Sequence, residues 1–282
     1  MDLQKYQSND EIAWCPGCGN FALLGSVKKA LAALELAPKD VLLVSGIGQA
    51  AKLPHYLRCN CFNGLHGRAL PVAAGAKMAN RALTVLVTTG DGDCYGEGGN
   101  HFLHNIRRNI DLTVVVHNNQ IYGLTKGQAS PTTDRGFVTK VQTQGVLLEP
   151  FHALAVAIAA GAGFVARGFV RDTERVAELI TAAIRHQGFS LVEVLQPCVS
   201  FNPKNTYEWY AERVCDIDQD KSYDRRDKIS ALEKSLEWGE RIPTGILYYD
   251  REKTYEDRSG LSVRPPLVEE NLGFEDVMRE FM

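Results

Sequence analysis

Three short segments of the chain combine glycine with acidic or amide side chains. They are residues 46–48 (Gly-Ile-Gly), 90–93 (Gly-Asp-Gly-Asp) and 118–121 (Asn-Asn-Gln-Ile). Glycine permits tight turns in which main-chain N–H groups approach a phosphate closely. Asp91, the side-chain oxygen of Asn119 and a nearby main-chain carbonyl are hard oxygen ligands that suit Mg²⁺ bridging a diphosphate. Gly-Asp-Gly alone is usually only a turn between a strand and a helix, so the expectation depends on its combination with Asn-Asn.

The chain has seven cysteines, an odd number that cannot all pair as disulfides. Cys15 and Cys18 form a Cys-x-x-Cys pair, which suits an iron–sulfur cluster, a zinc ion or a redox dithiol, or has no such role. A zinc ribbon needs a second Cys-x-x-Cys, and Cys59-Asn60-Cys61 has the wrong spacing. The pair alone therefore leaves its chemistry open.

The elements that position these segments follow from short apolar runs. Strands are predicted at residues 41–44, 83–88, 112–116, 164–170 and 191–194. Helices are predicted at residues 20–34 (capped by Asn20), 49–57, 99–108, 151–162 and 173–187. Continuous apolar strands alternating with helices indicate a doubly wound α/β fold with a mostly parallel sheet. Such sheets bind ligands at the carboxyl ends of their strands, which is where the three segments fall.

Composition limits the function classes. With 31 basic and 34 acidic residues among 282, the net charge is −3, which argues against a nucleic-acid or membrane-surface protein. Residues 1–11 do not form a signal peptide, and the longest apolar stretch, 153–165, is too short for a bilayer of about 30 Å. We therefore expect a cytoplasmic protein with no membrane partner. Residues 1–201 form the expected sheet domain, and residues 202–282, with one amphipathic helix at 229–238, form an extension. We expect this extension to contact a partner subunit, and the alternative is a partly flexible tail.

The combination of Gly-Asp-Gly, a helix and strand, and then Asn-Asn resembles the thiamine diphosphate motif. Over residues 10–205 the chain is similar to the β subunit of 2-oxoacid:ferredoxin oxidoreductases, and most like those acting on 2-oxoglutarate. The matching motifs are long and ordered: residues 14–19 (Trp-Cys-Pro-Gly-Cys-Gly), 65–71 (Leu-His-Gly-Arg-Ala-Leu-Pro), 90–93, 99–102, 107–111, 119–128 and 196–198 (Gln-Pro-Cys).

The resemblance implies a thiamine diphosphate site with Mg²⁺ held by Asp91, Asn119 and the main-chain carbonyl of Ile121. The residues that it places along the cofactor are Ile47, Gly48, His66, Gly90, Asp91, Gly92, Asp93, Asn119, Ile121, Gly123 and Leu124. Among them Gly92, Asp93, Gly123 and Leu124 would contact the diphosphate. His66 has an alternative interpretation, because a histidine in a glycine-rich loop is often only a hydrogen-bonding strut.

The resemblance also implies a [4Fe–4S] cluster held by Cys15, Cys18 and Cys198. The family's usual remaining cysteine follows the Gly-Ile-Gly turn, where this chain has Gln49. Cys59 is the expected fourth ligand, on the assumption that a short helix after Gln49 returns the chain to the same region. Cys61 is the first alternative, and a non-cysteine ligand is the second. The remaining cysteines, Cys94 and Cys215, are expected to be packed or incidental thiols.

Lys126 lies where the family faces its substrate, and a fixed ammonium suits the second carboxylate of 2-oxoglutarate. The implied reaction converts 2-oxoglutarate and coenzyme A to succinyl-CoA and CO₂, or the reverse, with ferredoxin exchanging electrons. In the family a separate α subunit supplies the domain that binds the aminopyrimidine ring, so we expect this chain alone to be inactive. The alternatives are a pyruvate or broad-range 2-oxoacid enzyme, a non-oxidative thiamine diphosphate decarboxylase subunit, and a zinc- or cluster-binding interaction module without enzymatic activity.

Overall fold

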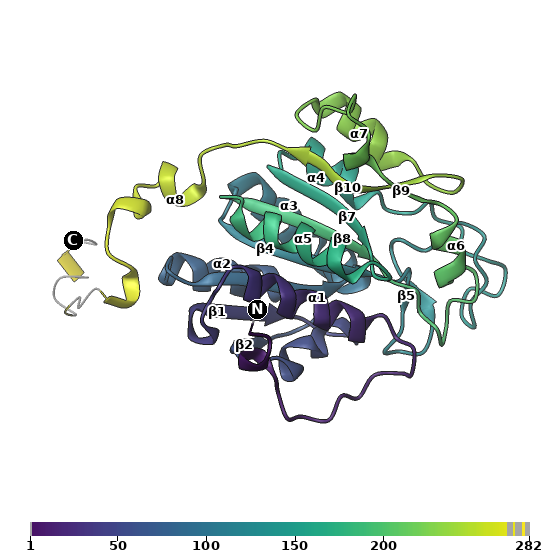
Figure 1. The fold of residues 1–282 in the computed structure, drawn as a ribbon, viewed down its shortest axis with the longest axis horizontal. Coiled ribbons are helices and arrows are strands. Elements are labelled where there is room, and N and C mark those ends of the chain that lie inside the picture. Colours follow the sequence, from purple (N-terminus) through teal and green to yellow (C-terminus); the bar gives the residue numbers. More distant parts are fainter. Residues whose placement is uncertain (1, 270–272, 274–277, 280–282) are drawn as a thin grey trace.

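The computed structural model of this chain describes residues 2–269, 273 and 278–279 (Figure 1). Within these residues one eight-stranded sheet has the order β2-β1-β3-β4-β8-β7-β10-β9. Neighbours from β2 to β7 are parallel, whereas β10 runs antiparallel to β7. The strands are β1 (Val41–Ser45), β2 (Asn60–Asn63), β3 (Thr84–Gly90), β4 (Leu112–Asn118), β7 (Phe164–Phe169), β8 (Phe189–Leu195), β9 (Val214–Asp216) and β10 (Ile242–Tyr249). The predicted mostly parallel α/β fold is thereby confirmed.

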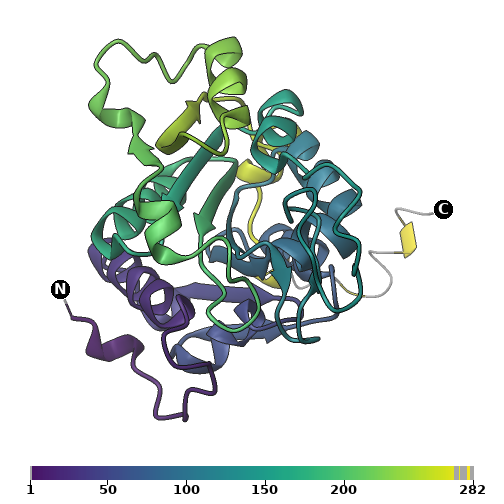
Figure 2. The same cartoon turned by 90° about the vertical axis from the view of Figure 1, so that its right-hand side faces the viewer.

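Helices cover both faces of this sheet (Figures 1 and 2). α1 (Asn20–Ala33) and α5 (Thr173–Arg185) pack together on one face, and α2 (Ala69–Ala79), α3 (Gly99–Arg108) and α4 (Ala153–Ala159) lie on the other. None of the helices in the described ranges is long and apolar enough to cross a membrane.

The two apolar layers explain why the central strands read as continuous apolar runs. Successive side chains of a strand point to opposite faces, so Val115 of β4 joins the layer under α1 and α5 while Val114 and Val116 join the opposite layer. All seven residues of β4 are buried. A strand covered on both faces has no solvent-exposed side, so its sequence lacks a regular alternation of apolar and polar residues.

Two predictions about the first elements need correction. Asn20 does not cap α1, because it is the first helical residue and Gly19 precedes it as the cap. Its buried side chain instead hydrogen-bonds His117 and Gln196. The helix predicted at 49–57 is a tight 3₁₀ segment, η3 (Ala50–Tyr56), with Pro54 inside it.

The segment after residue 202 adds to the same sheet. Besides α6 (Tyr207–Ala211) and α8 (Tyr255–Arg258), it contains α7 (Lys228–Leu236), which confirms the predicted helix and packs against α4. Strands β9 and β10 were missed, because Pro243 and Gly245 interrupt the apolar pattern of β10 and its pairing is irregular between Ile246 and Tyr248. The division at residue 202 and the partner contact of this segment stay predictions.

Candidate active site

The ends of β1, β3 and β4 bring the three glycine and amide segments to one edge of the sheet. They enclose a cavity, here called the glycine-loop cavity. It is lined by every residue that the resemblance placed along the cofactor, together with residues that the sequence did not predict: Gln49, Ala50, His117, Tyr122, Thr125 and Gln196. Because parallel strands end at the same edge, loops that are far apart in the chain meet here.

Asp91 is buried at the entrance to η4 (Gly92–Glu97), a segment wound as a π-helix. Its Oδ2 atom accepts hydrogen bonds from the hydroxyl groups of Ser130 (2.5 Å) and Thr132 (2.6 Å). Burial raises the pKa of Asp91 to about 6, although these hydrogen bonds oppose the shift. A carboxylate that pays this desolvation cost is stabilised by a nearby cation, so Asp91 fits a Mg²⁺ ligand. Neither hydroxyl group was predicted from the sequence. Ser130 and Thr132 lie far along the chain from Asp91, and no local motif links them to its carboxylate.

Asp93 braces three segments of the cavity wall. Its Oδ1 atom accepts hydrogen bonds from the main-chain nitrogens of Ile47 (3.1 Å) and Gly67 (2.7 Å), and its Oδ2 atom accepts one from the Thr89 hydroxyl (2.6 Å). The Nδ1 atom of His66 lies 2.9 Å from the same carboxylate. The Asp93 side chain is therefore engaged with protein groups, and only its main chain fits a diphosphate contact. His66 lines the cavity, but its Nδ1 atom makes no hydrogen bond among the described residues, so both the cofactor contact and the strut stay predictions.

A small hairpin closes the cavity from the side. It consists of β5 (Ile121–Tyr122) and β6 (Gln128–Ala129). The Tyr122 hydroxyl donates a hydrogen bond to the main-chain oxygen of Gly92 (3.2 Å), and any Cβ atom at Gly92 would collide with the Tyr122 ring. Gly92, the second glycine of Gly-Asp-Gly, is thus required by close packing with Tyr122. The absence of a side chain would also let its main chain approach a phosphate.

Asn118 and Asn119 have different tasks. Asn118 is buried, donates to Glu193 (3.0 Å) and accepts from Thr132 (2.9 Å), so it links β4 to β8 and to the Asp91 network. Asn119 lines the cavity, and its Oδ1 atom accepts a hydrogen bond from the Ile121 nitrogen (3.1 Å). The second asparagine is consequently the one positioned to reach a ligand.

Cys15, Cys18 and Cys198 surround a second cavity, here called the cysteine cavity. It adjoins the glycine-loop cavity, since Gln49, Asn119, Gly123, Leu124 and Gln196 line both. Within the described ranges no group of three or more His, Cys, Asp and Glu side chains is arranged to hold a single metal ion. Three soft thiols that line one cavity could serve as ligands of an iron–sulfur cluster.

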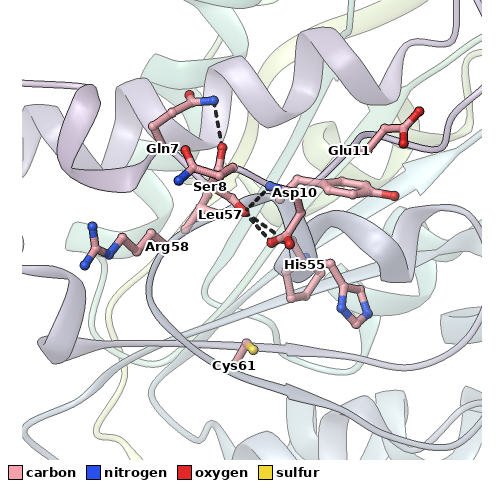
Figure 3. Close-up of a pocket in the computed structure, with 11 residues that line it drawn as sticks. Gln7, Ser8, Asp10, Glu11, His55, Leu57, Arg58 and Cys61 are labelled. Carbon is pink, nitrogen blue, oxygen red and sulfur yellow. Dashed lines mark hydrogen bonds between the residues drawn. The ribbon is translucent and has the colours of Figure 1, made fainter.

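The structure does not bring Cys59 or Cys61 to the cysteine cavity. Asn60, the first residue of β2, pairs with Leu42 in the parallel strand β1, so Cys59 lies at the amino edge of the sheet. The cofactor loops lie at the carboxyl edge, about 15 Å away along a five-residue strand. The assumed return of the chain after Gln49 was wrong, because a parallel neighbour requires η3 to carry the chain back to the amino edge. Figure 3 shows Cys61 in a separate hollow with His55 and Arg58.

The other two cysteines also lie outside the cysteine cavity. Cys94 is buried within η4, and burial raises the pKa of its thiol well above the usual value. Cys215 lies in β9, where its sulfur accepts a hydrogen bond from the Arg241 guanidinium (3.0 Å).

A buried hydrogen-bond chain that was not predicted from the sequence connects the two cavities. The Nδ1 atom of His117 lies 2.8 Å from the Oδ1 atom of Asn20, which also accepts a hydrogen bond from the Gln196 amide (2.9 Å). The Gln196 amide nitrogen lies 4.0 Å from the Cys18 sulfur. Burial lowers the pKa of His117 to about 3, so this ring is neutral at ordinary pH.

Lys126 lies on the wall of the cysteine cavity and does not line the glycine-loop cavity. It occupies a left-handed turn (φ 72°), and its nitrogen donates a hydrogen bond to the Gly123 oxygen (3.2 Å). Lys126 is exposed where it lines this cavity.

Comparisons with known proteins agree with this site. The model of the thiamine pyrophosphate enzyme C-terminal TPP binding domain matches residues 45–194, which hold the glycine and amide segments. The model of the C-terminal part of the pyruvate ferredoxin oxidoreductase β subunit matches residues 198–261. The 2-oxoacid:ferredoxin oxidoreductase subunit β of Saccharolobus solfataricus is 45% identical over 286 residues, covering 97% of this chain and 92% of the relative. This chain belongs to the family of 2-oxoacid:ferredoxin oxidoreductase β subunits.

Further relatives of this β subunit carry 2-oxoglutarate in their names. The 2-oxoglutarate synthase subunit KorB of Methanocaldococcus jannaschii is 40% identical over 199 residues, 70% of this chain and 74% of the relative. A solved 2-oxoglutarate:ferredoxin oxidoreductase from Magnetococcus marinus, with 2-oxoglutarate, coenzyme A and succinyl-CoA bound, superposes with a TM-score of 0.92 at 33% identity. That match covers 100% of this chain and 96% of the other. The predicted family and oxidoreductase class are confirmed, and the interaction-module and non-oxidative alternatives are set aside.

Proposed function

We propose that this β subunit binds thiamine diphosphate with Mg²⁺ and a [4Fe–4S] cluster in a 2-oxoglutarate:ferredoxin oxidoreductase. The balanced reaction converts 2-oxoglutarate, coenzyme A and two oxidised ferredoxins to succinyl-CoA, CO₂, two reduced ferredoxins and a proton. The observation that carries the proposal is the pair of adjoining cavities, one lined by Asp91 and Asn119 and the other by three cysteines. Bound thiamine diphosphate would supply carbanion-stabilising chemistry, and a cluster would supply one-electron transfer.

The chain's own residues would hold these groups by complementary chemistry. Asp91, Asn119 and the Ile121 carbonyl would ligate Mg²⁺, since oxygen ligands suit this cation. The main chain at Gly92, Asp93, Gly123 and Leu124 would contact the diphosphate. The Asp93 carboxylate would hold the loops that carry Ile47 and Gly67 in position through its hydrogen bonds. Ile47, Gly48, Gly90 and His66 would border the rest of the cofactor.

The cysteine cavity would hold the cluster through Cys15, Cys18 and Cys198. The two cavities share walls, so an electron would have a short path between the groups bound in them. Gln196 would lie beside this path, because it lines both cavities and its amide nitrogen approaches the Cys18 sulfur.

The α subunit would dock on the segment of residues 137–148. Leu147 and Leu148 are 82% and 78% exposed, and Val138 and Val141 are exposed beside them. Leu147, Leu148 and Tyr122 line one groove, and Tyr122 also lines the glycine-loop cavity. An exposed apolar patch that continues into a half-built active site fits the partner that completes the site. We accordingly expect no turnover by this chain alone.

Lys126 would favour 2-oxoglutarate through its second carboxylate. A broad-range 2-oxoacid enzyme is the second candidate, supported by the name of the Saccharolobus relative. The deciding experiment reconstitutes the chain with its α subunit and compares rates on 2-oxoglutarate and pyruvate with coenzyme A and ferredoxin. Equal rates on the two acids would favour the broad-range enzyme, and CO₂ release without ferredoxin reduction would overturn the oxidoreductase.

A further inference from the structure

The cysteine cavity is lined by an amide side chain, that of Gln49, besides its three thiols. The Oε1 atom of Gln49 is buried and has no hydrogen-bond partner among the described residues, and Gln49 lines this cavity. Buried polar atoms without partners are uncommon in native proteins and usually indicate a missing ligand or water. The main chain of Gln49 is held in place, because its oxygen accepts a hydrogen bond from the Trp14 indole (3.0 Å). Trp14 directly precedes Cys15, so this bond ties Gln49 to the Cys-x-x-Cys loop.

The other candidates for a fourth ligand beside the three thiols either have a hydrogen-bond partner or lie far from the cavity. Gln196 also has an unpartnered Oε1 atom, but its amide nitrogen is held by Asn20 and faces the Cys18 sulfur as a donor. Cys59 lies at the opposite edge of the sheet, and Cys61 lines the separate hollow of Figure 3. Gln49 is the lining residue that combines an unpartnered buried oxygen with a main chain tied to the Cys-x-x-Cys loop.

We propose that the cluster has three cysteine-bound irons and a fourth iron that faces Gln49, through the amide oxygen or a water held by it. This inference rests on the cluster assigned under the proposed function. Thiolates are much stronger ligands for cluster iron than a neutral oxygen is, so the iron at Gln49 would be the labile one. The cluster would then change its iron content reversibly, which an all-cysteine site resists.

Loss of the labile iron can be written as an oxidation of the cluster. When [4Fe–4S]²⁺ gives one electron to ferricyanide and releases one Fe²⁺, the product is [3Fe–4S]⁺. Charge and iron both balance, and the three remaining irons keep their cysteine ligands. The product has an electron paramagnetic resonance signal that [4Fe–4S]²⁺ lacks, so the step is visible without any activity measurement.

The test uses the αβ complex purified without air, as the wild type, Gln49→Cys, Gln49→Ser and Cys59→Ser. Gln49→Ser is the matched control, because serine has the size of cysteine without a thiol. After one equivalent of ferricyanide, we expect wild type, Gln49→Ser and Cys59→Ser to develop the three-iron signal and to lose about one iron in four. Gln49→Cys should develop at least tenfold less signal, and added Fe²⁺ with a reductant should restore the wild-type cluster.

Two outcomes would overturn the assignment of Gln49. One is a wild-type cluster that resists ferricyanide as well as Gln49→Cys does. The other is a Cys59→Ser variant that loses iron before oxidation while the wild type does not. A wild type without iron and sulfide would instead overturn the cluster in the proposed function, and calorimetry with thiamine diphosphate and Mg²⁺ would show whether the rest of that function survives. Circular dichroism confirms that each variant is folded.

Discussion

The Oδ1 atom of Asp93 lies 2.7 Å from the main-chain nitrogen of Gly67. This bond joins the loop after β3 to the loop that carries His66, and the same atom also reaches Ile47. Gly67 must remain glycine, because its φ is +69° and a Cβ atom there would collide with the Glu97 main chain. One carboxylate thus sets the spacing of the loops that would enclose a cofactor.

Asp93→Ala should destabilise the chain and weaken cofactor binding. It removes the acceptor of three hydrogen bonds, and at about 1 kcal/mol for each bond we expect a loss of about 2–4 kcal/mol in the free energy of unfolding. Asp93→Asn is the matched control, since its amide oxygen still accepts from the two main-chain nitrogens. Urea unfolding and calorimetry with thiamine diphosphate measure both effects. Equal losses in the two variants would contradict the bracing role.

Asp91 should make the cofactor-free chain less stable as pH rises from about 4 to 6. Its folded pKa is about 6 against an ordinary value of 3.8, so the folded state binds more protons than the unfolded state over this interval. Asp91→Asn removes this slope, and its stability relative to wild type should rise by about 3 kcal/mol across the interval. Comparing the two proteins isolates Asp91, because His117 contributes an opposite slope to both. Parallel stability curves would contradict the raised pKa.

Mg²⁺ with thiamine diphosphate should reverse this behaviour. A cation favours the charged carboxylate, so cofactor affinity should fall as pH drops below about 6, where a proton competes for Asp91. Calorimetry at several pH values measures the affinity. Affinity that is independent of pH between about 5 and 7 would remove Asp91 from the cation site.

Lys126→Ala should reduce kcat/KM for 2-oxoglutarate roughly tenfold to a hundredfold, since a charge-assisted contact contributes about 1.5–3 kcal/mol. The value for pyruvate, which has no second carboxylate, should not change. Lys126→Arg keeps the charge and should retain most of the preference. The reconstituted complex is assayed with both acids, and an unaltered ratio of the two rates would exclude Lys126 from substrate selection.

Leu147→Ser combined with Leu148→Ser should weaken association with the α subunit by at least tenfold. Both side chains are largely exposed in the isolated chain, so the stability of the chain alone should change little. Val263→Ser is the control, because Val263 is 88% exposed in a different part of the chain. Sedimentation or light scattering of the mixed subunits measures the association. Undiminished assembly would move the interface elsewhere.

Local sequence was sufficient for the central elements of the fold. The runs that became β3, β4 and β8 are mainly apolar because helices cover both faces, and α3 begins and ends where it was predicted. Edge elements were harder to predict. β2 has four exposed residues with asparagine at both ends, and β10 contains proline and glycine, so neither shows a periodic apolar pattern.

The sequence by itself determined the family, the central strands of the sheet and most of the residues that line the glycine-loop cavity, because long ordered motifs at strand ends have few alternative arrangements. Only the tertiary structure decided which cysteines stand together. Strands β1 and β2 are parallel, so the connection between them returns the chain to the amino edge of the sheet. Gln49, at the start of this connection, therefore lies beside the three thiols, whereas Cys59, at its end, lies at the amino edge. Ser130, Thr132 and His117 were likewise invisible in the sequence, since their roles depend on side chains that approach from other segments of the fold.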